Sequence, residues 1–201
     1  MINKNEKTAI LGSHNSWSYL PPRKWWMKPF AFMARCQKAN IRAQYERYGV
    51  RCFDLRVRFD ALNRSVIAHG VIEYGFTAGS GLYAELHRFN EAGDVMVRVL
   101  HEVRSKGPYT EEHVRLFRAF CESVAQRYPN IRFWCGRNLY NWEKDYDFGE
   151  DPSCEERYAS VSRPRMLDDW WPWLFARLRN RAVLQAGTDK DVLLMDFVNI
   201  R

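Results

Sequence analysis

Short runs of aliphatic, β-branched and aromatic residues recur along this chain, and helical patterns separate them. The run 50–57 has strict two-residue periodicity, with Phe53 and Leu55 on one side and Asp54 and Arg56 on the other. Further strands are expected over residues 8–11, 66–69, 95–101, 131–134 and 192–197. Strands that alternate with helices predict an α/β fold with a parallel sheet, open or closed into a barrel.

The expected helices are indicated by their ends. Thr110 can cap a helix that must end before Pro129, and a shorter helix ends at Gly49, which suits a left-handed cap. A third helix carries Pro172 in its first turn, where proline is tolerated. The acidic, aromatic-rich stretch 137–163 fits neither pattern, so we expect a long loop there.

The length and composition fit one folded domain over residues 1–201. A chain of this size buries roughly 70% of the surface that it exposes when unfolded, and 46% hydrophobic with 27% charged residues excludes a disordered or fibrous protein. No apolar run approaches the roughly 20 residues that span a bilayer, and the start lacks the apolar core of a signal peptide. We expect a soluble monomer. The sequence leaves open whether it is exported or lies at a membrane surface.

The distribution of charge and the spacing of the cysteines indicate which binding partners the chain can have. The net charge is +7, and residues 21–58 hold ten basic against two acidic residues, whereas 139–156 hold seven acidic residues and one lysine. A basic stretch favours an anionic partner, such as the phosphate esters of lipids or nucleic acids. The five cysteines form no C-x-x-C pair, so we interpret them as buried small hydrophobes rather than metal ligands.

Two histidines stand where predicted strands end. His14 follows the first apolar run within Gly-Ser-His-Asn-Ser, and His69 directly precedes Gly70. Active sites of α/β folds lie at the carboxyl ends of strands, although a lone histidine there is often structural. Burying Asp54 and Arg56 on one strand face is costly unless they pair or hold a ligand, and an exposed edge strand is the alternative.

These groups suit the attack of a neighbouring hydroxyl on a phosphodiester. One imidazole removes the hydroxyl proton, the other protonates the leaving oxygen, and a guanidinium holds the non-bridging oxygens. Because an unperturbed histidine has a pKa near 6.5, one ring can be neutral while the other is charged at physiological pH. This route requires no metal ion.

Several motifs resemble the X domain of the phosphatidylinositol-specific phospholipases C. They are Gly-Ser-His-Asn-Ser at 12–16, Gly-Val-Arg-x-x-Asp-Leu-Arg at 49–56, Ala-His-Gly at 68–70, and the closing run 194–199, which is similar to the last strand motif of bacterial members. The resemblance implies a distorted (β/α) TIM-type barrel. An incomplete barrel is the alternative, because the chain is short for the family and only six strands are indicated.

The resemblance also implies roles for five residues. His14 would be the general base, His69 the general acid and Arg56 the phosphate clamp, with Asp54 as its charged neighbour and Asp196 orienting the base. In that family the 2-hydroxyl of inositol attacks its own phosphate, which releases diacylglycerol and an inositol 1,2-cyclic phosphate.

One position departs from the bacterial pattern. Asn15 stands where bacterial members usually carry an aspartate, as in calcium-dependent eukaryotic members, in which that asparagine binds the ion. Arg56 occupies the second acidic position of the eukaryotic strand motif, and its charge would repel a cation. We therefore expect no cofactor, and calcium at Asn15 is the alternative.

The residues that contact the substrate and the membrane are less well defined. Candidates for substrate binding are Asn15, Glu102, Arg104, Arg137, Glu156 and Tyr158. Trp25 and Trp26 lie among basic residues, which suits a transient membrane contact, and packing on the domain's own surface is the alternative.

Three functions compete on these grounds. The first is a phosphodiesterase that cleaves a phospholipid headgroup. The second is the same chemistry on another phosphodiester such as RNA, which is not favoured because no aromatic and basic RNA-binding motif is visible. The third is a catalytically inactive lipid-binding module, which would need neither an acid nor a base.

Overall fold

The computed structural model describes residues 9–102, 110–138, 158–160, 171–186 and 191–200, with the side chains of 135–138 and 158–160 left out. The strands are β1 Ile10–Ser13, β2 Cys52–Phe59, β3 Ser65–His69, β4 Ile72–Phe76, β5 Met96–Glu102, β6 Arg132–Asn138, β7 Tyr158–Ser160 and β8 Val192–Met195. The helices are the 3-10 turns η1 Trp25–Phe30 and η2 Thr77–Gly79, with α1 Ala31–Ala34, α2 Ile41–Glu46, α3 Leu82–Ala92, α4 Glu111–Arg127 and α7 Pro172–Ala186.

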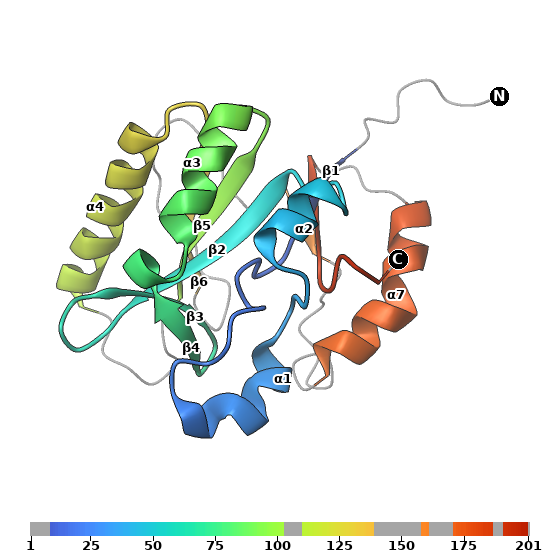
Figure 1. Cartoon of the computed structure of the whole chain (residues 1–201), viewed down its shortest axis with the longest axis horizontal. Helices are drawn as coiled ribbons and strands as arrows, with labels where there is room; N and C mark the ends of the chain where they lie inside the picture. The colour runs from blue at the N-terminus through green and yellow to red at the C-terminus, as the bar shows by residue number, and fades with distance from the viewer. Residues whose placement is uncertain (1–8, 103–109, 139–157, 161–170, 187–190, 201) are drawn as a thin grey trace.

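Strand β2 lies at the centre of a forked sheet (Figure 1). One edge pairs in parallel with β5, which pairs in turn with β6. The other edge is shared: parallel β1 pairs with 52–53, and antiparallel β3 pairs with 57–59. Strands β8 and β7 continue the sheet beyond β1, and β4 continues it beyond β3. The fold is therefore mixed α/β.

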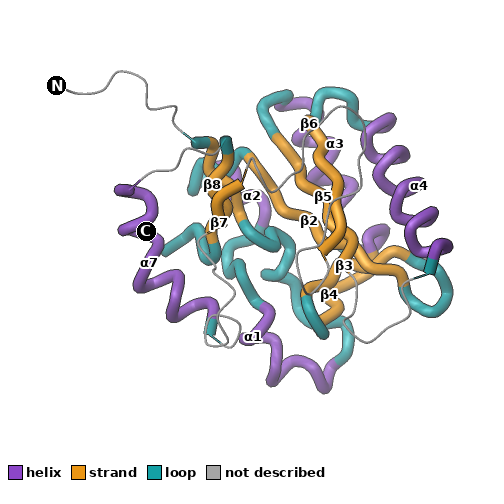
Figure 2. Tube along the Cα trace, turned by 180° about the vertical axis from the view of Figure 1, so that it is seen from behind, coloured by secondary structure: helices purple, strands orange, loops and turns teal. Residues whose placement is uncertain are grey.

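The prediction of a parallel sheet is wrong for β3 and β4, which form an antiparallel hairpin. Only residues 60–64 join β2 to β3, and a parallel crossover needs a dozen or more residues. The sheet curls (Figure 2), and in the described part of the chain β6 and β7 do not pair with each other. Closure into a barrel stays a prediction.

The predicted helices are present in the described ranges. The Thr110 hydroxyl accepts a hydrogen bond from the His113 N–H at 3.3 Å, and α4 ends at Arg127. Helix α2 ends three residues before Gly49, whose φ of +69° is left-handed, and α7 begins at Pro172.

The long loop predicted over 137–163 is wrong at 137–138 and at 158–160, and residues 161–163 lie outside the described part. Residues 137–138 belong to β6, and Tyr158–Ser160 form β7, which pairs in parallel with β8. The partner of β7 is more than thirty residues further along the chain. Local periodicity gives no sign of such pairing, because only the distant partner makes the short strand favourable. Residues 139–157 lie outside the described part.

The two faces of β2 have opposite chemistry. Phe53 and Leu55 belong to the hydrophobic core with residues of α3 and α4, and the Phe53 ring stacks on Phe89 with centroids 4.5 Å apart. Truncating a buried phenylalanine typically costs about 3–5 kcal/mol, so this face holds the strand firmly. The other face buries Asp54 and Arg56, which the core packing therefore fixes in place.

Candidate active site

The two histidines reach the same stretch of β2 from opposite directions. Strand β1 pairs with β2 only at 52–53 and β3 only at 57–59, so residues 54–56 have no strand partner on that edge. His14 directly follows β1, and His69 ends β3. Because β1 is parallel and β3 antiparallel to β2, both strands end towards this gap.

A close approach of β1 to β8 sets the position of His14. Gly12 pairs with Leu194, and a Cβ on Gly12 would lie 2.6 Å from Cδ2 of Leu194. A larger residue would require the side chain of Leu194 to shift and would crowd Val192 and Cys52, which favours glycine two positions before His14. The close pairing brings the end of β1 beside Asp196, the residue after β8.

Arg56 lies between the two imidazoles. Its Nη2 is 2.6 Å from Nε2 of His14, and its Nη1 is 3.1 Å from Nδ1 of His69. The two rings are nearly perpendicular, with centroids 5.6 Å apart. The structure therefore brings together both histidines and the arginine that the sequence analysis singled out.

The hydrogen bonds assign a tautomer to each neutral ring. A guanidinium only donates, so Nε2 of His14 accepts from Arg56, and its Nδ1–H donates to Oδ1 of Asp196 at 2.7 Å. By the same reasoning, Nδ1 of His69 accepts and its Nε2 carries the proton. Nε2 of His14 thus carries a lone pair, and Nδ1–H is bonded to a carboxylate, which is the arrangement that a general base requires. In the free protein Arg56 donates to this lone pair.

Asp54 holds the guanidinium of Arg56 in place through hydrogen bonds and charge. Its Oδ2 accepts hydrogen bonds from Nε of Arg56 at 2.9 Å and from the Asn15 backbone N–H at 3.0 Å, and Nη1 of Arg98 lies 3.4 Å from Oδ1. Burial alone would raise the pKa of Asp54, but the charges of Arg56 and Arg98 outweigh it and hold the pKa below its usual range. Asp54 is therefore an anion that fixes the guanidinium.

Glu102 connects the arginine to the second histidine. Its Oε2 accepts from Nη1 of Arg56 at 3.3 Å, and its Oε1 accepts from the Gly70 N–H at 2.7 Å. Burial and then the Arg56 charge lower the pKa of His69, although Glu102 opposes them. Without a ligand His69 is therefore neutral.

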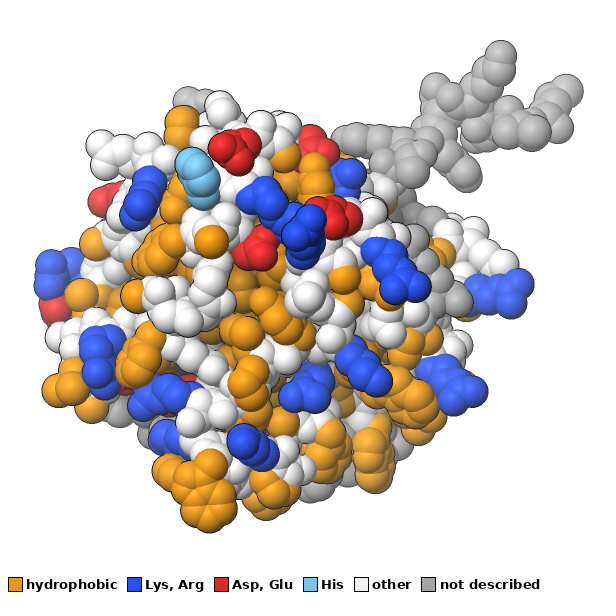
Figure 3. Space-filling model, in the orientation of Figure 1, with side chains coloured by type: hydrophobic (Ala, Val, Ile, Leu, Met, Phe, Trp, Pro, Cys, Tyr) orange, Lys and Arg blue, Asp and Glu red, His pale blue; other side chains and the backbone are white. Residues whose placement is uncertain are grey.

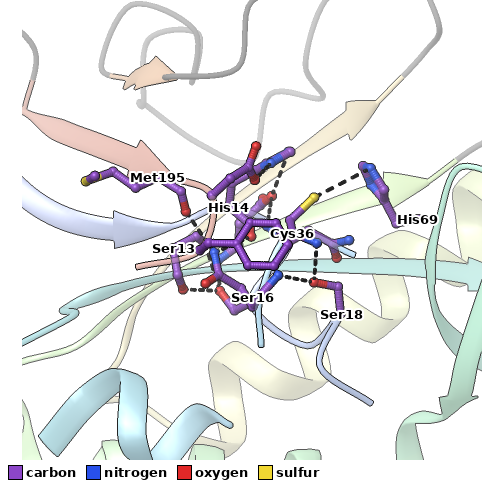
Figure 4. Close-up of polar contacts among 12 residues, drawn as sticks. Ser13, His14, Ser16, Ser18, Cys36, His69 and Met195 are labelled. Carbon is purple, nitrogen blue, oxygen red and sulfur yellow. Dashed lines mark hydrogen bonds and ion pairs between the residues drawn. The ribbon is translucent and has the colours of Figure 1, made fainter. Parts of the chain in front are cut away.

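Serine hydroxyls after His14 tie the site to its surroundings (Figure 4). The Ser16 hydroxyl accepts from the Asp54 N–H at 2.8 Å. The Ser18 hydroxyl accepts from the backbone N–H groups of Cys36 and Gln37 at 3.0 and 2.9 Å. The polar residues that follow β1 therefore hydrogen-bond both to β2 and to the segment that contains Cys36 and Gln37.

Gln37 is a site residue that the sequence analysis missed. Its side chain is fully buried, and its Nε2 donates to the His14 carbonyl at 3.0 Å and the Met195 carbonyl at 2.7 Å. Its Oε1 accepts from the Val198 N–H at 3.2 Å. Gln37 thereby clamps the chain at the base to the chain at its carboxylate. No local pattern could reveal this, because its partners are far away in sequence.

Cys36 is buried, as predicted for the cysteines, but it lies at the site. Its Sγ is 4.0 Å from Nε2 of His69 (Figure 4). Burial and then the Asp196 charge raise the pKa of its thiol, so Cys36 is protonated and is not a nucleophile. Among the described residues, ligand atoms of His14, Cys36 and Asp196 lie within 4.8 Å of one another and form a group that could hold a metal ion.

The remaining substrate-binding candidates have mixed outcomes. Asn15 is buried with a φ of +44°, and its Nδ2 donates to the Ala34 carbonyl at 3.4 Å. Arg104 and Glu156 lie outside the described residues, and the side chains of Arg137 in β6 and Tyr158 in β7 are not described.

Trp25 and Trp26 lie apart from the histidines, in η1. They are 75% and 52% exposed, so much of each indole is accessible to solvent. Phe30 and Phe32 are about as exposed as Trp26, and α1 contacts α7, which has exposed apolar residues of its own. Figure 3 shows hydrophobic side chains along the lower edge of the molecule, where α1 and α7 lie in Figure 1, with lysines and arginines between them. Exposed apolar patches of this kind mark interaction sites.

The comparisons with known proteins show the fold. No protein-family model and no curated protein matches the chain. A phosphatidylinositol-specific phospholipase C from Listeria monocytogenes superposes with a TM-score of 0.63 at 13% identity, over 94% of this chain and 88% of that chain. A single-site mutant of the phosphatidylinositol-specific phospholipase C from Staphylococcus aureus gives 0.59 at 15% identity, over 94% and 84%.

At these identities the likeness shows the fold alone. In the described ranges, no helix reaches both the length and the apolarity that crossing a membrane requires. The chain has a mixed α/β fold with a curled sheet, and this fold is similar to that of bacterial phosphatidylinositol-specific phospholipases C.

Proposed function

We propose that this protein is a phosphodiesterase that cleaves a phospholipid headgroup through attack by a neighbouring hydroxyl, with no metal cofactor. The products are diacylglycerol and a cyclic phosphate. One observation carries the proposal: a buried guanidinium donates hydrogen bonds to two imidazoles, one of which is backed by a carboxylate. A binding module would need neither the carboxylate nor the second ring.

The substrate phosphate first replaces the imidazoles as acceptor for Arg56. A phosphate adds the attraction of an opposite charge and accepts two parallel hydrogen bonds from one guanidinium, which a neutral imidazole cannot do. Arg56 is anchored at Nε by Asp54, so it keeps its place while Nη1 and Nη2 turn to the non-bridging oxygens. This exchange frees Nε2 of His14 and Nδ1 of His69 for proton transfer.

His14 then acts as the base. Its Nε2 takes the hydroxyl proton while the hydroxyl oxygen attacks phosphorus, and Asp196 stabilises the resulting imidazolium through Nδ1–H. His69 donates a proton to the leaving diacylglycerol oxygen as its bond to phosphorus breaks. Arg56 meanwhile stabilises the negative charge on the non-bridging oxygens. After the reaction His14 releases its extra proton to solvent, and His69 takes up a proton from solvent.

Substrate binding sets the protonation state of His69. In the free protein, burial and the charge of Arg56 lower its pKa. A bound phosphodiester brings one negative charge that offsets the charge of Arg56, so the pKa rises and the ring takes up a proton. Binding of the substrate phosphate therefore protonates His69 and converts it into the general acid.

The membrane surface is the proposed place of the reaction. Trp25 and Trp26 are exposed, and the ammonium of Lys24 lies 5.7 Å from the Trp26 ring centroid. Indoles favour the headgroup depth of a bilayer, and lysines favour anionic lipid. Replacing both tryptophans by alanine should weaken binding to phosphatidylinositol vesicles while leaving turnover of a soluble short-chain substrate unchanged.

The control for this test is Leu62→Ala, because Leu62 is 71% exposed in the turn between β2 and β3. It should leave vesicle binding unchanged. Equal losses of the double variant on vesicles and on the soluble substrate would refute the membrane contact.

Product analysis tests the proposed reaction. The protein is incubated with phosphatidylinositol vesicles and excess EDTA, and the phosphorus NMR spectrum is followed. The proposal predicts a five-membered cyclic phosphate signal that His14→Ala and His69→Ala each remove. An absolute requirement for calcium would contradict it, as would cleavage of RNA in place of the lipid.

A further inference from the structure

Cys36 has no part in the reaction proposed above, although it lies in the candidate active site beside His14, Asp196 and His69. Its Sγ, a ring nitrogen of His14 and a carboxylate oxygen of Asp196 lie within 4.8 Å of one another, and Nε2 of His69 is 4.0 Å from Sγ. The Cys36 residue is 3% exposed, and the His14 and Asp196 side chains are 11% and 8% exposed. Thiolate, imidazole and carboxylate are the ligands that zinc takes in proteins.

The spacing of these atoms is close to that of a tetrahedral site. Zinc bonds of about 2.3 Å to sulfur and 2.0–2.1 Å to nitrogen put neighbouring donors roughly 3.6 Å apart. The donor atoms of His14, Cys36 and Asp196 lie within 4.8 Å of one another, so Sγ must move by only about 1 Å to reach this separation. His14 and Asp196 are closer, at 2.7 Å, and must separate by less than about 1 Å once a metal ion replaces their shared proton.

The local charge accommodates a divalent cation. Asp54 and Glu102 pair with the guanidinium groups of Arg56 and Arg98, whereas Asp196 brings its negative charge to His14, which is itself a proposed ligand. Loss of the thiol proton to solvent adds a second negative charge, and the two match the ion.

The direction of approach also avoids the arginine. Arg56 lies at Nε2 of His14, whereas Nδ1 faces Asp196. An ion held by Nδ1 is therefore on the far side of the ring from the guanidinium.

We propose that His14, Cys36 and Asp196 form a three-ligand site for zinc or a similar thiophilic divalent cation, and that the bound ion switches the enzyme off. Coordination at Nδ1 moves the ring proton of His14 to Nε2, and because the guanidinium only donates, Arg56 and the ring must then separate. The nitrogen that should take the hydroxyl proton then already carries one. The inhibition rests on the proposed function, whereas the metal site does not.

Cobalt(II) provides a direct probe of the site, because a cobalt–thiolate bond gives a charge-transfer absorption in the near ultraviolet. The intact protein should bind one cobalt ion with this band, and zinc should displace the cobalt. Cys36→Ser should remove the band. Cys121→Ser should retain it, because Cys121 is an equally buried free thiol on α4.

A second variant tests the constellation rather than the thiol alone. His14→Gln keeps Cys36 and should weaken cobalt binding by more than about tenfold, since even partners outside the first shell change metal affinity by 10- to 100-fold. Circular dichroism checks that each variant is folded. A band that survives Cys36→Ser, or an affinity unchanged in His14→Gln, would overturn the metal site.

The readout separates this site from the proposed function. Metal binding without any lipase activity would keep the site and reject the proposed reaction. Activity on phosphatidylinositol that zinc leaves unchanged at concentrations that saturate the cobalt site would reject the inhibition.

Discussion

Replacing Arg56 by lysine separates the charge of this residue from the shape of its guanidinium. Arg56 uses Nε towards Asp54, Nη2 towards His14, and Nη1 towards both His69 and Glu102. A lysine ammonium keeps the positive charge for the two carboxylates but presents one nitrogen in place of three. Its single nitrogen cannot face Asp54 and grip two phosphate oxygens at once.

The expected magnitude follows from these contacts. Loss of one preorganised donor to a developing oxyanion costs about 10²–10³ in kcat, and Arg56→Lys loses the paired donation, so we expect a fall of at least that size. Stability should change little because Asp54 and Glu102 keep a cation. Arg56→Met is the matched contrast. It leaves buried carboxylates without that partner, and breaking such a pair typically costs about 3–5 kcal/mol.

The pH dependence of the unfolding free energy has opposite signs in the two proteins. In the wild type, the folded state lowers the pKa of Asp54, so its stabilisation is present at neutral pH and is lost as the pH falls through the acidic range. In Arg56→Met, acid neutralises the orphaned carboxylate and should recover part of the loss. Denaturant unfolding at several pH values and steady-state kinetics measure both effects. Full activity of Arg56→Lys would refute the role of the guanidinium.

Three further predictions concern the groups around Arg56. Gln37→Leu should lower kcat by about 10–100-fold with little change in KM, because a shift of about 1 Å in the base costs about that much; an unchanged kcat, or a rise in KM alone, would refute the clamp. Asp196→Asn should lower kcat by about 10⁴-fold, as a wrong His14 tautomer does in serine proteases, and a loss below tenfold would contradict the assigned tautomer. Binding of a non-hydrolysable phosphonate analogue at pH 7 should take up about one proton per ligand at His69, because its pKa is lowered in the free protein; calorimetry in buffers of different ionisation enthalpy measures it, and zero uptake would reject a substrate-made acid.

The sequence predicted the parts of this molecule that depend on local pattern. The alternation of Phe53 and Leu55 with Asp54 and Arg56 predicted which side chains share a face of β2, and the structure buries both faces. The cap at Thr110 and the proline at 172 predicted helix starts for the same local reason, whereas α2 ends three residues before Gly49, with Arg47 as its C-cap.

Features that depend on distant pairing could not be predicted in this way. The short strand β7 exists through its pairing with β8, and the hairpin of β3 and β4 reverses the direction that strand and helix alternation suggested. Gln37 and Cys36 join the site because the segment before α2 crosses the ends of β1 and β8. A glutamine or a cysteine carries no sign of such a crossing in its own neighbourhood.

The protonation of the two imidazoles tests the central claim most directly. Long-range proton–nitrogen NMR on histidine-labelled protein reports which nitrogen of each ring carries a proton. We expect His14 to be protonated at Nδ1 and His69 at Nε2 in the free protein, and His69 to be protonated at both nitrogens once a phosphonate analogue is bound. A free protein in which Nε2 of His14 carries the proton, or a His69 that stays neutral with the analogue bound, would contradict the central claim.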